Sequence, residues 1–250
     1  MPAWAQGTHR GHAYRAGLAT LFRTPSLALF GSALGYGAFA QNGGFDLAQT
    51  LFIAITVFAL PGQIVLVDQY AQGASLAALA LSVTLTAIRL LPMSVVLTPY
   101  LCGPKGPTWR TFAAMHFLAI TSWVEGMRWL PRLAPPMRMP YFAGVISAIA
   151  TSVLSATIIG FLLADTVPTP VAAALLFVTP IYFLLALLQP ALKADLVAIG
   201  VGGVIGPLAF MVVPGFELLL AGLIGGTIAF GVHSRSKARH LQRPGADRSG

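Results

Sequence analysis

The sequence LAQTLFIAITVFALPGQIVLVDQY, residues 47–70, contains an apolar run long enough to cross a bilayer, which needs about 20 such residues. Pro61 and Gly62, residue types that break or kink helices, interrupt the run. It also carries Gln63 and Asp68, whose polar groups are costly to place in hydrocarbon. The stretch therefore predicts a membrane segment that is broken where polar side chains gather.

The composition of the whole chain is typical of a membrane protein. Of the 250 residues, 56% are hydrophobic and 9% are charged, whereas a soluble domain carries about 25% charged residues. We expect an all-α polytopic membrane bundle, and the alternative is an unusually apolar soluble protein. The net charge of +8 resides mainly at the chain ends and in loops, which favours a cytoplasmic membrane flank over nucleic-acid binding.

The sequence lacks the common catalytic motifs. It contains no Walker loop, no H-E-x-x-H and no G-x-S-x-G. Cys102 is the only cysteine, so an intrachain disulfide and a cysteine metal cluster are excluded. We therefore expect neither an enzyme nor a protein that holds a cofactor or a metal.

Eight apolar segments follow one another along the chain. Thr24 and Pro25 open the first, as a helix N-cap and a first-turn proline do. These segments predict a transmembrane domain over 24–232 between a basic segment, 1–23, and a basic disordered tail, 233–250, which is either solvated or in contact with anionic lipid. The segments cover residues 26–41, 47–70, 75–101, 110–130, 141–164, 170–190, 195–213 and 216–232.

The basic residues predict the side of the membrane that each loop faces. With eight spans, 12 of the 15 Lys and Arg residues fall on one side, together with both ends of the chain. Lys105 and Arg110 fall on the other side, and Arg89 lies inside the third segment. Because cytoplasmic loops are enriched in Lys and Arg, both termini are predicted to be cytoplasmic.

Other segments also carry a proline near the middle. Broken helices at this depth build the substrate sites of many transporters, and the alternative is a simple proline kink. FALP (58–61) is similar to FVTP (177–180), which is either a repeat of two four-span halves or a chance likeness of apolar segments. The further interrupting residues are Pro92, Pro180 and the pair Gly206-Pro207.

Arg89 is the clearest ionisable residue at membrane depth. It lies near the centre of the third segment, in LTAIRLLPMS (85–94). Its planar guanidinium suits a carboxylate. That carboxylate belongs either to a ligand or to the protein, in an ion pair with Asp68 or Glu125.

The fourth segment carries the other candidate polar residues. At about 100° per residue, Thr121, Glu125 and Arg128 share one helix face, and His116 points to the opposite side. Glu125 either pairs with Arg128 or is a buried carboxyl that binds and releases a proton during transport. Asp68 is likewise either a helix-end residue or a coupling carboxyl, and His116 is either a buried hydrogen-bonded histidine or a proton shuttle.

The order of these features resembles the AzlC family of bacterial branched-chain amino-acid permeases. FALPGQI (58–64) is similar to a family stretch of the form FAGSAQF, and AIRLLPMSVVLTPYL (87–101) is similar to N-x-R-H followed by L-x-P-Y-L. FLAITSWVEGM (117–127) falls near a family F-L-T-D-E, and LLFVTPIYFLL (175–185) resembles L-x-F-L-T-P-L-Y-F. The resemblance covers roughly residues 15–232.

The chain departs from the family pattern at several polar positions. The family has Asn and His around its arginine, where this chain has Ala87 and Leu90. Its serine-containing turn is Leu60-Pro61-Gly62 here, and its Asp-Glu pair is replaced near Ser122-Trp123, with Glu125 following. If those family residues determine substrate specificity, this chain belongs to a divergent branch of the family and has another substrate.

The resemblance implies an exporter or permease of branched-chain amino acids in the bacterial inner membrane, with a small hydrophobic partner of the AzlD type. We therefore predict a secondary transporter of small amino acids, with proton coupling as one option and no ATP hydrolysis of its own. The alternatives are a transporter of another small solute and a non-transporting subunit that scaffolds a partner. The predicted substrate-binding residues are Pro61, Gly62, Gln63, Arg89, Thr121 and Ser122, and the predicted proton-coupling residues are Asp68, His116 and Glu125.

Overall fold

The computed structural model describes residues 9–88, 90–103, 106–166, 168–178, 180–181, 193–212, 223–228 and 231. Within these ranges every regular element is helical, apart from an isolated bridge between Gly103 and Gly106, so the all-α prediction is confirmed. The chain divides into two units, Met1–Tyr182 and Phe183–Gly250.

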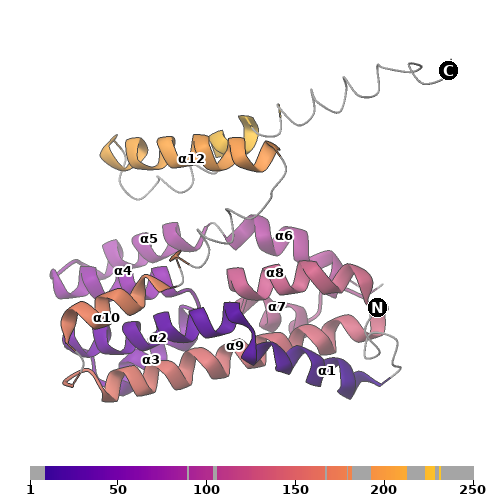
Figure 1. Ribbon diagram of the computed structural model, residues 1–250, viewed down its shortest axis with the longest axis horizontal. Helices are drawn as coiled ribbons and strands as arrows, with labels where there is room; N and C mark the ends of the chain where they lie inside the picture. Colours follow the sequence, from indigo (N-terminus) through magenta and orange to yellow (C-terminus); the bar gives the residue numbers. More distant parts are fainter. Residues whose placement is uncertain are drawn as a thin grey trace, which may run out of the picture. The chain divides into compact units, whose positions relative to one another are not determined.

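The first unit contains ten α-helices in the described ranges (Figure 1). Two short 3-10 helices, η2 (Ala19–Phe22) and η3 (Leu130–Arg132), follow α1 and α8. The α-helices are α1 (Arg10–Leu18), α2 (Thr24–Asn42), α3 (Leu47–Thr56), α4 (Leu60–Ala71), α5 (Leu76–Ala87), α6 (Leu90–Leu101), α7 (Trp109–His116), α8 (Ile120–Trp129), α9 (Pro135–Leu162) and α10 (Thr169–Leu176).

Helices α1 and α2 lie one after the other along α9 and run in the same direction (Figure 1). The Ser152 hydroxyl donates to the Ser26 carbonyl at 3.3 Å, and near the end of α2 Gln41 Nε2 donates at 3.3 Å to Oδ2 of Asp165, which follows α9. The backbones approach closely because glycines leave room: a Cβ added to Gly160 would overlap the Leu34 carbonyl. Such small-residue contacts are typical of helix pairs in membranes.

Helices α3 and α4 form a hairpin, which we call the first hairpin (residues 47–71). The chain enters it at Phe45 and returns at Tyr70, and the two rings lie 4.7 Å apart. The break between the helices covers residues 57–59. The helices have 10 and 12 residues, or about 15 and 18 Å, so neither alone crosses a bilayer core of about 30 Å.

Helices α7 and α8 form the second hairpin (residues 109–129), broken at 117–119. Both of its ends lie at the beginning of α9, because Trp109 lines the same cavity as Pro135, and α8 runs through η3 directly into α9. The two hairpins meet at their tips. The rings of Phe58 and Phe117 lie 5.0 Å apart, edge to face, and His116 Nε2 lies 2.8 Å from the Ile55 carbonyl oxygen.

Helices α5 and α6 connect the two hairpins and are bent by 52° where they join. Helix α5 packs beside α4, and the Arg138 guanidinium lies 5.7 Å from the ring of Tyr100 in the last turn of α6. The pair therefore leads from the open end of the first hairpin to the open end of the second. The two hairpins therefore enter the first unit from opposite ends.

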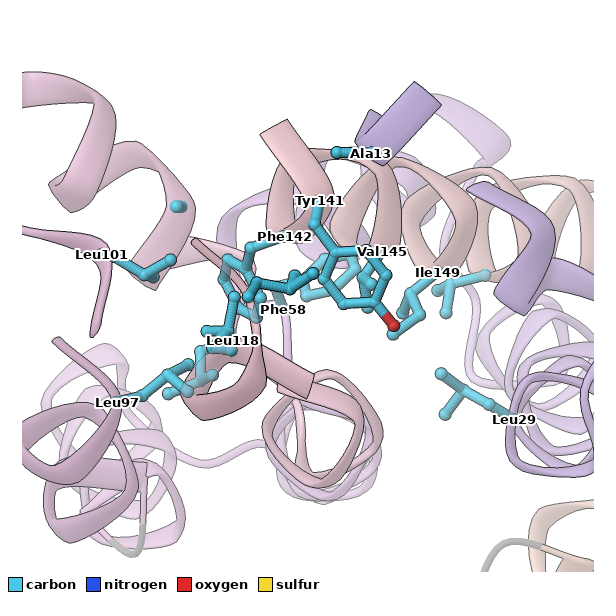
Figure 2. Close-up of a cluster of buried hydrophobic side chains, with 14 of the residues drawn as sticks. Ala13, Leu29, Phe58, Leu97, Leu101, Leu118, Tyr141, Phe142, Val145 and Ile149 are labelled. Carbon is cyan, nitrogen blue, oxygen red and sulfur yellow. The ribbon is translucent and has the colours of Figure 1, made fainter. Parts of the chain in front are cut away.

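The hydrophobic core lies around the hairpin tips and α9. Figure 2 shows Phe58 of the first break near Leu118 of the second break and Phe142 of α9, and all three belong to one buried cluster. Leu97 of α6 and Leu29 of α2 extend the cluster on either side. The core therefore fixes both helix breaks in the interior of the first unit.

By length and composition, α9 can cross a membrane, and the bent pair α5–α6 is a second candidate if it forms one span. The prediction of eight spans is not confirmed by this test. The segments expected at 47–70 and 110–130 each consist of two short helices instead of one span. The eighth segment lies largely outside the described residues.

The predicted proline breaks are only partly correct. Pro61 lies in the first turn of α4, so it starts a helix just after the break at 57–59 instead of interrupting one. Pro92 lies in the first turn of α6. The interruption predicted at Gly206-Pro207 is wrong, because α12 (Lys193–Val212), in the second unit, continues through it. Pro180 lies next to residues outside the described ranges.

The side predicted for the loop at 102–110 is also wrong. Arg110 is predicted to lie opposite Arg10, but both line a cavity of about 800 Å³, together with Pro135 and Pro136 of α9. The reason is that the segment at 110–130 turns back as a hairpin, so it does not change sides. Lys105 lies outside the described residues.

Candidate functional site

Helices α4 and α8 both begin where the hairpin tips meet. The residues that precede them, Ala59 and Ala119, have extended backbones (φ −148° and −122°) and line one shared cavity. The first N–H groups of a helix lack intrahelical acceptors, and the helix dipole adds positive potential there. Two helix N-termini at one place favour an anionic group such as a carboxylate.

Local sequence explains why both helices start at these points. Pro61 has no N–H to leave unpaired in the first turn of α4. Gly62 is tightly enclosed, since a Cβ there would lie 3.1 Å from Val57 Cγ1. In α8, Ser122 Oγ accepts from the Ala119 N–H at 2.8 Å and donates to the Ala119 carbonyl at 2.9 Å, so its hydroxyl stabilises the break.

The shared cavity between the tips is small. Its volume is about 30 Å³, enough for about one water molecule. An amino-acid side chain does not fit in it without movement of the surrounding helices. The walls are mainly apolar and come from both breaks, α2 and α9: Leu29, Phe58, Ala59, Leu60, Gln63, Ala119 and Val153.

Two buried side-chain oxygen atoms in the first turns of α4 and α8 have no hydrogen-bond partner. Gln63 Nε2 donates to the Val57 carbonyl at 2.7 Å, but Gln63 Oε1 is unpaired, and so is Thr121 Oγ1. Gln63 is 1% exposed and Thr121 6%. Leaving such a group unpaired in the interior costs about 1–3 kcal/mol. The unpaired atoms therefore point to a ligand or a water molecule at this place.

Glu125, one turn after Thr121 on α8, is buried and lies in a partly buried ionic cluster. It forms an ion pair with Arg23, and the Tyr141 hydroxyl donates to Glu125 Oε1 at 2.9 Å. The predicted pair of Glu125 with Arg128 is wrong. Arg128 is exposed and stacks over Trp129 at 5.6 Å, because α8 turns its charged end toward the surface.

The remaining predicted residues have different positions. Asp68 is exposed near the end of α4, where it accepts from Gln72 Nε2 at 2.8 Å, as a helix-end residue does. His116 is exposed and contacts the Ile55 carbonyl, so the predicted buried histidine is wrong although the hydrogen bond is present. Arg89 lies outside the described residues. Pro61, Gly62, Gln63, Thr121, Ser122 and Glu125 all lie in the first turns of α4 or along α8.

Sequence reasoning missed Arg23 and Tyr141. Arg23 precedes Thr24-Pro25 and was indistinguishable from a basic flank of the first span. In the structure it separates η2 from α2 with an extended backbone (ψ 153°), which turns it toward α8. Tyr141 is fully buried on α9, and no sequence pattern distinguishes it from core aromatics. Within the described ranges, no group of three or more His, Cys, Asp or Glu residues could hold a metal.

Comparison with known proteins gives one match. A family model described as "AzlC protein" matches residues 25–167, more than half of the chain. The matched region includes both hairpins, α2 and α9. No curated protein and no solved structure matches the chain.

Proposed function

Because the chain belongs to the AzlC family, which is membrane-associated and linked to branched-chain amino-acid transport, we propose that it is a secondary exporter of branched-chain amino acids. The observation that carries the proposal is the meeting of two opposed helix breaks, with unpaired Gln63 and Thr121 atoms at the helix starts. Opposed half-helices at mid-depth are a common design for sites that bind small charged solutes in membranes.

The proposed roles follow from chemistry. The N-termini of α4 and α8 favour the substrate carboxylate, Gln63 and Thr121 offer hydrogen bonds, and Leu29 and Val153 favour a branched apolar side chain. Arg89 remains a proposed carboxylate ligand, as its sequence position suggests. The chain has no ATPase motif, so export would use an ion gradient or the substrate gradient.

Further parts of the proposal concern the membrane and the partner. We place the chain in the bacterial inner membrane, with several crossings and both termini cytoplasmic. Glu125 is the proposed proton-coupling carboxyl, since it is buried beside the helix start, whereas Asp68 and His116 are weaker candidates because they are exposed. A small hydrophobic AzlD-like subunit is the proposed partner.

A second function is a non-transporting subunit that scaffolds a partner. The small size of the central cavity favours it, because about 30 Å³ admits no amino acid in this state. It predicts that Gln63 and Thr121 never meet a solute. A third, transport of another small solute, follows from the departures at Ala87 and Leu90 from the family pattern.

The test is efflux of leucine, isoleucine, valine and methionine from preloaded cells that express the chain, with and without a small candidate partner. We expect faster efflux, and its loss in Arg89→Ala with membrane insertion intact. Wild-type rates in Arg89→Ala would remove the carboxylate role of Arg89. No efflux from inserted wild-type protein in either condition would contradict amino-acid export and leave the other functions.

A further inference from the structure

The cluster of Arg23, Glu125 and Tyr141 joins three elements that are far apart in the sequence. Arg23 lies between η2 and α2, Glu125 in the middle of α8, and Tyr141 in the first third of α9. The Glu125 side chain is 11% exposed and that of Arg23 37% exposed. A buried carboxylate such as Glu125 is costly inside a membrane protein and marks a ligand or ion pathway by default.

A contribution to folding does not explain the pair. Helix α9 already packs against α2 through glycines and against α8 through Gly126 and Phe142, and buried apolar contacts hold helices together without ions. A buried ion pair contributes little net stability, because the desolvation of two charges offsets their attraction. The pair therefore calls for a ligand that uses both charges.

The ion pair uses one oxygen of the Glu125 carboxylate and one nitrogen of the Arg23 guanidinium. Arg23 Nη1 and the Tyr141 hydroxyl both contact the same carboxylate oxygen, Oε1 of Glu125. Glu125 Oε2 receives no donor from the part of the chain that the structure describes, and Arg23 Nε and Nη2 have no acceptor there. A guanidinium with free neighbouring N–H groups suits a carboxylate, and a carboxylate with a free oxygen suits an ammonium.

Resting on the amino-acid transport proposed above, we infer that Arg23 and Glu125 bind the charged groups of a zwitterionic α-amino acid, Arg23 its carboxylate and Glu125 its ammonium. In this arrangement Arg23 takes the carboxylate in place of Arg89 and the helix starts, and Glu125 binds the ammonium instead of carrying a proton. Without substrate the two side chains neutralise each other, so the buried carboxylate of Glu125 is not left unpaired. When substrate enters, each exchanges its partner for one of opposite charge on the same small molecule. Tyr141 is a positioning residue, which holds Glu125 by its hydrogen bond.

The apolar part of such a ligand has a place nearby. Leu29 is six residues after Arg23 on α2, or about 9 Å along the helix, and Ala119 is six residues before Glu125 on α8. Both line the small apolar cavity at the hairpin tips, with Val153 and Phe58. An amino acid held by Arg23 and Glu125 would direct a branched side chain toward that cavity, whose walls must separate to admit it.

The first test uses the unmodified full chain, purified in detergent or nanodiscs. Binding of leucine is compared with that of 4-methylpentanoate, which lacks the ammonium, and isopentylamine, which lacks the carboxylate. We expect each analogue to bind at least about tenfold more weakly than leucine, because each leaves one of the two charged side chains without a partner. Equal binding of leucine and either analogue would overturn the inference.

The second test separates ligand binding from structure. Arg23→Ala is expected to weaken leucine binding by about tenfold to a hundredfold and to leave isopentylamine binding almost unchanged. Glu125→Gln is expected to weaken leucine binding and to leave the binding of 4-methylpentanoate almost unchanged. The control is Arg128→Ala, which removes an exposed arginine one turn from Glu125 and should leave the binding of all three ligands unchanged. If every ligand weakens equally in Arg23→Ala and Glu125→Gln, the pair is structural.

A charge exchange, Arg23→Glu with Glu125→Arg, gives an independent readout. If the pair is structural, the double variant should recover both the melting temperature and leucine binding. If the pair binds the ligand, only the melting temperature should recover, because the exchanged charges would bind leucine with its side chain pointing away from the apolar cavity. Recovery of binding would overturn the inference. Failure of the inference is distinct from failure of the proposed export: a chain that exports leucine and keeps its rate in Arg23→Ala contradicts the inference and leaves export of leucine standing.

Discussion

At the scale of single residues, the unusual feature is polar atoms left unpaired beside apolar walls. Gln63 uses its amide nitrogen to hold the Val57 carbonyl at the first break and leaves its oxygen without a partner. Thr121 Oγ1, in the first turn after the second break, also has no hydrogen-bond partner. A protein optimised only for stability would fill these positions with apolar side chains, because each unpaired atom costs about 1–3 kcal/mol.

Gln63→Met separates function from stability at this position. The change keeps a similar side-chain volume, loses one hydrogen bond and removes one unpaired oxygen, so the melting temperature should change by only a few degrees. If the oxygen binds substrate, leucine efflux should fall about tenfold or more. The control is Gln69→Met, two turns along the same helix. An equal loss of efflux in both variants would assign the effect to α4 as a whole.

The sequence predicted most of the polar residues at the helix starts but not their partners. Gln63, Thr121 and Ser122 are recognisable because polar residues in an apolar run are few. Arg23 is not recognisable, because an arginine before an apolar segment has the same pattern whether it flanks the membrane or turns inward. The short 3-10 helix η2 turns Arg23 inward, and the position of η2 depends on packing against α9.

At the scale of elements, the structure differs from the prediction in how the helices are divided. Hydropathy reads an uninterrupted apolar run as one span, and it cannot distinguish a kinked helix from a hairpin of two half-helices. The direction after a break is set by distant contacts, such as Phe45 with Tyr70 and Phe58 with Phe117. The likeness of 58–61 to 177–180 stays a prediction, because Thr179 lies outside the described residues.

The close packing of α2 on α9 gives a stability prediction at this scale. Gly160→Ala places a Cβ against the Leu34 carbonyl, a backbone atom that cannot turn aside, so overpacking should cost about 1–3 kcal/mol and lower the melting temperature in detergent. The matched control is Gly11→Ala in α1, where a Cβ meets nothing within 4 Å. There the better helix propensity of Ala should leave stability equal or raise it by up to about 1 kcal/mol. A Gly160→Ala protein as stable as wild type would contradict the helix contact.

At the scale of the whole first unit, charge is sorted between its two ends. Arg10 and Arg110 line the cavity beside the start of α9, and Arg138 lies there over Tyr100. Asp165 follows the last turn of α9 and bonds to Gln41 at the opposite end. Positive charge is enriched on the cytoplasmic side of membrane proteins, so the end with Arg10 and Arg110 should face the cytoplasm.

The single cysteine makes this orientation testable without engineering. Cys102 lines the cavity shared by Arg10 and Arg110, so a membrane-impermeant maleimide should label it in inside-out vesicles and not in intact cells. Thr166→Cys in a Cys102→Ser background should label with the opposite preference, because Thr166 is exposed beyond the end of α9. Eight simple spans would place both positions on the same side, since residues 102–110 and 165–169 are then loops of equal parity. Labelling of both cysteines from one side would therefore contradict the hairpin at 109–129. Labelling from opposite sides would contradict the eight-span count and support two helix breaks that face each other inside the membrane.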